Sequence, residues 1–255
     1  MGKLPLKSIL YLFLIFVNYG NLTGNTAIKE DYDIYLLIGQ SNMAGRGYML
    51  EADTLNFIDG VWLLNSDGVP EKAKSPFNKY SSIRKELKMQ NIGPGESFSK
   101  EIHRRTKKKI LLVVNARGGS SIKSWLPSAK DGYFDEAVRR TKQALDYGTL
   151  KAVLWHQGES NSGNPSNYLN DLKLMVEELR KRLNVPNVPF VAGEIAPWHP
   201  NRNKFNTVIH NIKDSIYNSD WVSSEGCAPR TDFKDPHFSR DGQMLLGFRY
   251  AEKNI

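Results

Sequence analysis

The stretch YLLIGQSNMAG, residues 35–45, decides the fold, because a buried strand ends there in a short polar turn. Its apolar and aromatic start is followed directly by Gly39, Gln40, Ser41 and Asn42. Gly39 and Gly45 permit the tight backbone that a strand needs if it is to turn at once into a helix. The turn therefore holds one serine out at the carboxyl end of a strand.

On both sides of this stretch, short apolar runs alternate with segments of helical period. Six segments are predicted strands: 33–38, 61–64, 109–115, 152–155, 189–192 and 221–224. Five are predicted helices: 96–105, 134–147, 166–183, 203–217 and 241–253. Such alternation predicts a single-domain, three-layer α/β/α sandwich with a mainly parallel sheet. Residues 68–95, rich in Lys, Ser and Pro, are predicted to form one long loop that has room for a short helix.

The composition excludes several classes of partner. The chain has 255 residues and a formal net charge of +8, and its densest basic run, residues 104–109, falls at the end of a predicted helix, where cations suit the dipole. Aromatic residues do not interleave with these charges, so no nucleic-acid partner is expected. No G-x-G-x-x-G or G-x-x-x-x-G-K-[ST] motif is present, and no nucleotide cofactor is expected.

The N-terminus has the pattern of a secretory signal. Lys3 and Lys7 precede nine apolar residues, 9–17, and a polar stretch follows. This core is shorter than the roughly 20 residues of a membrane span. We expect residues 1–24 to be a signal peptide and residues 31–255 to form the exported domain, in the periplasm or outside the cell. We expect the protein to contact the membrane only through the signal peptide. An uncleaved anchor is the alternative.

Three polar segments follow predicted strands and a fourth precedes the last predicted helix, and all four are expected at the edge where ligands bind in open parallel sheets. They are GQSN (39–42), NARGGSS (115–121), HQGESN (156–161) and DPHFS (235–239). A serine that attacks an ester needs a base, a group that orients the base, and donors for the oxyanion. We assign Ser41 as nucleophile, His237 as base and Asp235, two residues earlier in extended chain, as the orienting acid. The expected oxyanion donors are the N–H of Ser41, the N–H of Gly118 or Gly119, and the amide of Gln157.

The chain resembles the SGNH (GDSL-type) hydrolases, and among them the sialate O-acetylesterase and acetylxylan esterase branch, carbohydrate esterase family 6. The resemblance rests on four motifs in order: IGQSNMAG (38–45), NARGGSSIKSW (115–125), LWHQGESN (154–161) and DPHFSRDGQ (235–243). It implies a flavodoxin-like fold, no metal or other cofactor, and removal of acetyl groups from an acetylated oligo- or polysaccharide. It carries the nucleophile to Ser41, the base to His237 and the oxyanion donors to Gly118-Gly119 and Gln157.

One departure from the superfamily concerns the acid. The usual spacing is D-x-x-H, but Lys234 stands three residues before His237, so Asp235, Asp232 or Glu159 must orient the imidazole. A non-catalytic carbohydrate-binding protein with a degraded triad is therefore the alternative function. Substrate or support roles are assigned to four further residues: Gln40, Asn42, Glu159 and Trp198.

Overall fold

The computed structural model describes residues 1, 2 and 31–255, so the expected signal peptide lies outside the described residues. Seven strands form one sheet in the order β3-β2-β4-β1-β5-β6-β7. Their bounds are β1 (Tyr32–Gly39), β2 (Val61–Leu64), β3 (Pro70–Lys72), β4 (Lys109–Ala116), β5 (Gly148–His156), β6 (Phe190–Gly193) and β7 (Ser219–Val222). All neighbouring strands pair in parallel except β2 and β3, which are antiparallel.

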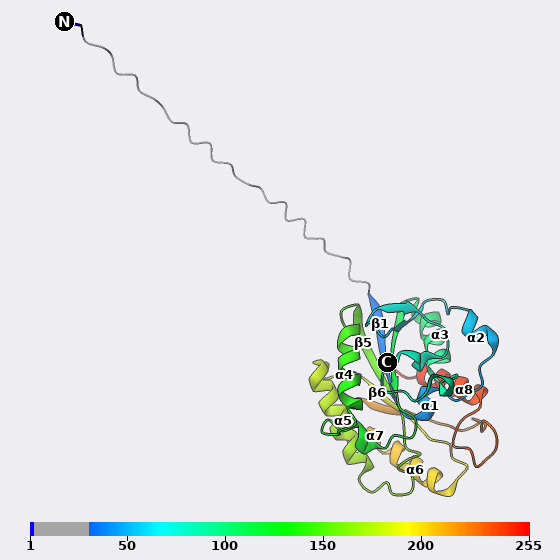
Figure 1. Ribbon diagram of the computed structural model, residues 1–255. Coiled ribbons are helices and arrows are strands. Elements are labelled where there is room, and N and C mark those ends of the chain that lie inside the picture. Colours follow the sequence, from blue (N-terminus) through cyan, green and yellow to red (C-terminus); the bar gives the residue numbers. More distant parts are fainter. Residues whose placement is uncertain (3–30) are drawn as a thin grey trace.

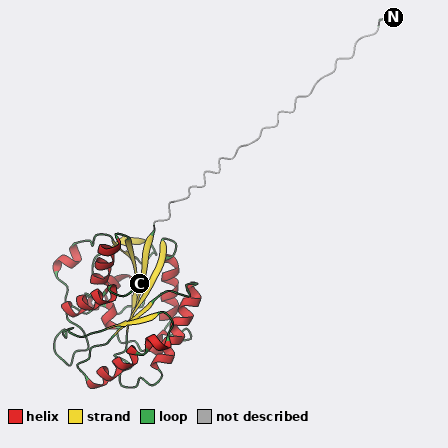
Figure 2. Ribbon diagram, turned by 180° about the vertical axis from the view of Figure 1, so that it is seen from behind, coloured by secondary structure: helices red, strands yellow, loops and turns green. Residues whose placement is uncertain are grey.

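Helices cover both faces of this sheet (Figures 1 and 2). They are α1 (Ser41–Ala44), α2 (Glu51–Leu55), α3 (Gly95–Thr106), α4 (Tyr133–Ala144), α5 (Tyr168–Leu183), α6 (Pro200–His210), α7 (Ile212–Ser215) and α8 (Arg240–Ala251). Three short 3₁₀ segments, Phe77–Tyr80, Leu87–Met89 and Ile122–Trp125, lie in the connections. Within the described part of the chain, no helix is both long and apolar enough to cross a bilayer. The predicted α/β sandwich with a mainly parallel sheet is confirmed.

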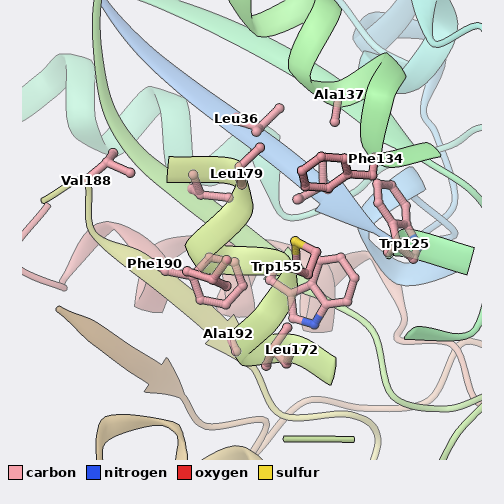
Figure 3. Close-up of a cluster of buried hydrophobic side chains, with 14 of the residues drawn as sticks. Leu36, Trp125, Phe134, Ala137, Trp155, Leu172, Leu179, Val188, Phe190 and Ala192 are labelled. Carbon is pink, nitrogen blue, oxygen red and sulfur yellow. The ribbon is translucent and has the colours of Figure 1, made fainter. Parts of the chain in front are cut away.

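The two faces of β1 belong to two separate cores, as the alternation of side chains along a strand requires. Ile34, Leu36 and Ile38 pack under α4 and α5 together with Trp155, and Figure 3 shows part of this cluster. Tyr35 and Leu37 pack on the opposite face, under α3 and α8. Because both faces of β1 are buried, its apolar side chains do not alternate with polar ones. The packing on both faces holds the end of the strand in place.

The structure differs from the prediction in two connections. Residues 68–95 are not one loop, because β3 pairs with the edge strand β2 and two 3₁₀ segments follow. Pro70, Glu71 and Lys72 carry no apolar signal, as is usual for an edge strand that faces water. The predicted helix 203–217 is two helices, α6 and α7, which meet at Asn211. The break lets Ile212 and Ile216 both reach the core.

Candidate active site

The candidate site lies where the central strands β4, β1 and β5 end. Gly39 closes β1 with a φ of 138°, and a Cβ there would lie 2.2 Å from the His156 carbonyl oxygen on β5. The site therefore requires glycine at this position. Ser41 follows as the first residue of α1. A pocket of about 350 Å³ opens above it, lined by Gln40, Ser41, Arg46, Lys85, Met89, Gly118, Gly119, Glu159, Ser160, Arg202, Pro236 and His237.

Ser41, His237 and Asp235 form one hydrogen-bonded chain although 196 positions separate the serine and the histidine. His237 Nε2 lies 3.0 Å from Ser41 Oγ. His237 Nδ1 lies 2.6 Å from Asp235 Oδ1, which also accepts from the His237 backbone N–H at 3.0 Å. Only 7% of Ser41 is exposed. This is the geometry in which an imidazole takes a proton from a serine hydroxyl while a carboxylate fixes its tautomer.

A small antiparallel turn explains how D-x-H spacing works here. Pro229 bridges Phe238, and the Arg230 N–H donates to the His237 carbonyl at 2.8 Å. The turn also aims Arg230 Nε (2.9 Å) and Thr231 Oγ1 (3.0 Å) at Asp235 Oδ2. Burial alone would raise the pKa of Asp235, but the N–H of His237 and the nearby charges outweigh it and lower that pKa. The carboxylate is therefore held ionised against the ring.

The two other candidate acids contact different groups. Asp232 Oδ1 accepts from the Lys234 backbone N–H at 2.7 Å and caps the loop. Glu159 Oε1 accepts from Asn42 Nδ2 at 2.6 Å, its Oε2 has no partner among the described residues, and burial raises its pKa. Neither acid contacts the ring of His237.

No group of three or more His, Cys, Asp or Glu within residues 31–255 is placed to hold a metal ion.

Asn42 and Trp198 support the histidine loop. Asn42 is fully buried, and its Nδ2 donates to the Pro236 carbonyl at 3.1 Å as well as to Glu159. Its Oδ1 accepts from the backbone N–H of Phe238 at 3.2 Å and from Nε2 of Gln243, on helix α8, at 2.9 Å. Trp198 Nε1 donates to the Asp235 carbonyl at 2.8 Å, and its ring packs edge-on against Phe238. Both residues fix the position of His237 relative to Ser41.

The two glycines expected to donate to the oxyanion differ in their position relative to Ser41. Gly118 lies beside the nucleophile, because a Cβ built on it would be 3.6 Å from Ser41 Cβ. Gly119, with a φ of 78°, lies farther along the same turn, beside Lys85. The backbone N–H groups of Gly118 and Gly119 donate to no described residue. The geometry therefore favours Gly118 as the glycine donor.

Gln157 is not a donor to the pocket, and this expectation was wrong. The residue is 0% exposed. Its Nε2 faces three acceptors, Gln40 Oε1 at 3.1 Å, the Ser120 carbonyl at 3.1 Å and Asn161 Oδ1 at 2.7 Å. Because an amide nitrogen carries only two hydrogens, neither remains for a ligand. The side chain points under the turn after β4 and not into the pocket.

Cationic side chains on the pocket wall were missed by the sequence reasoning. Arg46 is only 4% exposed, and its Nη1 donates to the carbonyls of Gly45 (2.6 Å) and Met89 (2.7 Å). It makes no ion pair with a described carboxylate, and burial lowers its pKa to about 10. Lys85 and Arg202 line the same pocket. The one available signal was the position of Arg46 directly after Gly45 in the first motif.

The charges around His237 set the pH range in which it can act as a base. Burial lowers the pKa of His237, Asp235 raises it, and the cations Arg46 and Arg230 lower it further. The net pKa lies below the ordinary value of 6.5. A base works in its neutral form, so ester hydrolysis should fall as the pH decreases through this lowered pKa. The acid limb of kcat/KM should lie below pH 6.5.

Replacing Arg230 by Met should move that acid limb to higher pH, by a few tenths to about one unit. The substitution removes a cation that lowers the pKa of His237, so protonation sets in earlier as the pH falls. The measurement is kcat/KM against pH from about 4 to 8. Lys234→Met removes a charge from the same loop without touching Asp235 and should leave the limb in place. A limb that stays fixed or moves down in Arg230→Met contradicts the assignment.

Comparison with known proteins agrees with this geometry. A family model described as carbohydrate esterase, sialic acid-specific acetylesterase, matches residues 31–255. A probable carbohydrate esterase of Arabidopsis thaliana is 29% identical over 241 residues, which cover 86% of this chain and 88% of that protein. A solved structure of an Arabidopsis thaliana protein has a TM-score of 0.77 at 27% identity and covers 87% of this chain and 97% of its own.

A carbohydrate acetylesterase of Xanthomonas citri shares the fold, with a TM-score of 0.60 at 16% identity, over 86% of this chain and 54% of that one. The resemblance to the sialate O-acetylesterase branch is confirmed at the level of the family. The chain therefore belongs to the carbohydrate esterase family of sialic acid-specific acetylesterases.

Proposed function

We propose that this protein is an exported serine esterase that removes O-acetyl groups from sugar hydroxyls through an acyl-serine intermediate. The observation that carries the proposal is the continuous hydrogen-bonded chain from Ser41 through His237 to Asp235 at the floor of an open pocket. The membership of the chain in a carbohydrate esterase family supports it. Export rests on the expected leader at residues 1–24.

The chemistry follows from the positions of these groups. Ser41 Oγ attacks the acetyl carbonyl carbon while its proton passes to His237 Nε2. The carbonyl oxygen becomes an oxyanion next to the N–H groups of Ser41 and Gly118. The C–O bond to the sugar then breaks, and His237 returns the proton to the departing alkoxide. Water, deprotonated by His237, hydrolyses the acetyl-serine and releases acetate.

We further propose that the sugar carries a carboxylate, as an O-acetylated sialic acid does. Arg46 is a buried cation without an anionic partner among the described residues, and such a charge is costly unless a ligand compensates it. A Cβ on Gly118 would lie 2.7 Å from Arg46 Nη2, and one on Gly119 would lie 3.6 Å from Lys85 Nζ. Both cations therefore flank the glycine turn next to Ser41.

The test compares an O-acetylated sialic acid with its methyl ester, and acetylated xylan with both, by measuring released acetate. A charge-assisted hydrogen bond should make kcat/KM about 10- to 100-fold higher for the free acid. Lys85→Met should reduce this preference several-fold. Lys88→Met, an exposed cation of the same segment that pairs with Glu86, should leave it unchanged.

The outcomes separate the two parts of the proposal. Equal turnover of acid and methyl ester would contradict the carboxylate site but leave the esterase in place. No acetate from any substrate, together with no labelling of Ser41 by a serine-reactive phosphonate, would contradict the esterase. Glycan binding by calorimetry without turnover would then establish the non-catalytic alternative.

A further inference from the structure

A large aromatic side chain, Phe233, lies exposed on the loop that carries His237. It stands four residues before the histidine, and 69% of it is exposed. Phe238, the other aromatic residue of this loop, is fully buried in the core. The loop therefore packs one ring into the protein and presents the other to water. Single exposed aromatic rings are common on protein surfaces, so the surroundings of Phe233 decide what it can do.

Hydrogen bonds hold the tip of this loop in one conformation. The backbone N–H of Asp235 donates to the Asp232 carbonyl at 3.0 Å, which closes a tight turn around Phe233. Asp232 Oδ1 also accepts from the backbone N–H of Lys234 at 2.7 Å. Trp198 Nε1 ties the turn to the segment before α6 by donating to the Asp235 carbonyl at 2.8 Å. Because the backbone is already ordered, a ligand that contacts Phe233 loses little affinity to ordering of the loop.

The same turn places Phe233 beside the active-site pocket. Pro236 and His237 follow the turn directly, and both line the pocket. The ring of Trp198 lies between the two aromatic rings of the loop, with its centroid 6.1 Å from that of Phe233 and 5.6 Å from that of Phe238. Trp198 thus supports Phe233 from one side, while most of the Phe233 ring stays open at the rim.

The size of the pocket implies that a long glycan must continue over this rim. Its volume of about 350 Å³ is at the small end of the range for ligand sites. A sugar whose acetyl group reaches Ser41 fills much of this space, and the next sugar of a chain then lies outside. The C–H faces of a sugar ring are apolar and lose contact with water when they stack on an aromatic ring. An exposed, rigidly held phenyl ring at the rim is suited to this contact.

We propose that Phe233 is the stacking platform for the sugar next to the acetylated one, so that the enzyme prefers acetylated sugars within a glycan to acetylated monosaccharides. This assignment rests on the proposed esterase function. The neighbouring sugar takes no part in the chemistry, so its contact with Phe233 is equally strong in the ground state and in the transition state. Such uniform binding lowers KM and leaves kcat nearly unchanged.

The test compares acetate release from each acetylated sugar alone and within a longer glycan. One pair of probes is an O-acetylated sialic acid as a monosaccharide and the same sugar linked to lactose. The other pair is an acetylated methyl xyloside and acetylated xylotetraose. Covering one face of a phenyl ring should raise kcat/KM about tenfold for the linked sugar of the pair that the wild type hydrolyses faster. Phe233→Ala should lose this preference through a higher KM and keep the wild-type constants for the monosaccharide.

Two further variants separate stacking from other effects of the substitution. Phe233→Tyr keeps a flat ring and should retain the preference for the linked sugar. Tyr217 is similarly exposed, at 72%, but it lies just before the start of β7, at the edge of the sheet opposite the pocket. Tyr217→Ala should therefore leave the preference unchanged. Thermal unfolding of each variant checks that the fold is retained.

A merely structural role of Phe233 would give a different result. If the ring only stabilised the loop, Phe233→Ala would displace His237 and lower kcat equally for the monosaccharide and for the linked sugar. That result would overturn the assignment and leave the esterase in place. So would an unchanged preference in Phe233→Ala, or a wild type that does not distinguish the two forms. A wild type that releases no acetate even from the monosaccharides would instead refute the proposed function, and the assignment with it.

Discussion

Ser41→Ala is expected to lower kcat for acetate release by about 10⁴- to 10⁶-fold, which is the range found when a serine nucleophile is removed. In the proposed mechanism this hydroxyl forms the acetyl-enzyme, and it is the one that His237 Nε2 contacts. His237 would retain its contact with Asp235, so the rest of the site should stay assembled. The substitution deletes one atom from a residue that is nearly buried, and the stability should change little.

The measurement is acetate release with an acetylated sugar and with p-nitrophenyl acetate, together with phosphonate labelling followed by peptide mass spectrometry. Label should appear on the peptide that contains Ser41 and disappear in Ser41→Ala. Ser162→Ala removes a serine hydroxyl from the loop after β5, where it only donates to the Glu159 carbonyl, and should keep wild-type turnover within a few-fold. Equal rates for Ser41→Ala and wild type would rule out the acyl-serine mechanism.

The sheet was predictable because its central strands are covered on both faces. Residues 110–114 and 152–155 have no polar alternation, and such runs fit only a strand between two helical layers. The position of Ser41 at the end of β1 then follows from the topology, because the carboxyl ends of parallel strands share one edge. β3 escaped prediction for the converse reason, since it pairs on one side only and its residues are polar.

The direction of side chains in the loops was beyond sequence reasoning. Gln157 and Gln40 are both amides at strand ends, and nothing in their sequence positions tells which one faces the pocket. The direction of the Gln157 side chain depends on the acceptors that its Nε2 faces. These come from three other places in the chain: Ser120, Asn161 and the nucleophile turn. Arg46 was missed for a related reason, because a single arginine after a glycine forms no recognisable pattern until folding buries it.

The second large effect is expected from His237→Gln, which should lower kcat by about 10⁴- to 10⁶-fold. Gln can hydrogen-bond to Ser41 but cannot accept its proton, because an amide nitrogen has no basic lone pair. The loss should persist across the pH range, unlike that of a variant that only shifts the pKa of the base. Activity of His237→Gln that approaches the wild-type value at high pH would show that hydroxide or another base suffices.

The three acids near His237 should differ sharply in the same assay. Asp235→Asn should cost about 10²- to 10⁴-fold, because its one remaining oxygen cannot accept both from His237 and from Arg230. If the amide NH₂ group faces Nδ1, the ring takes the tautomer that carries its hydrogen on Nε2, which cannot accept from Ser41. Asp232→Asn should have little effect, because that carboxylate only caps its own loop.

Glu159→Gln should also be mild, since a Gln oxygen can still accept from Asn42 Nδ2. The ranking of the three substitutions therefore tests which acid orients the imidazole, and kcat at a fixed pH near 7.5 measures it. A loss in Asp232→Asn or Glu159→Gln as large as that in Asp235→Asn would show that the contact of Asp235 with the ring does not set the tautomer. The short D-x-H spacing would then be a consequence of loop packing alone.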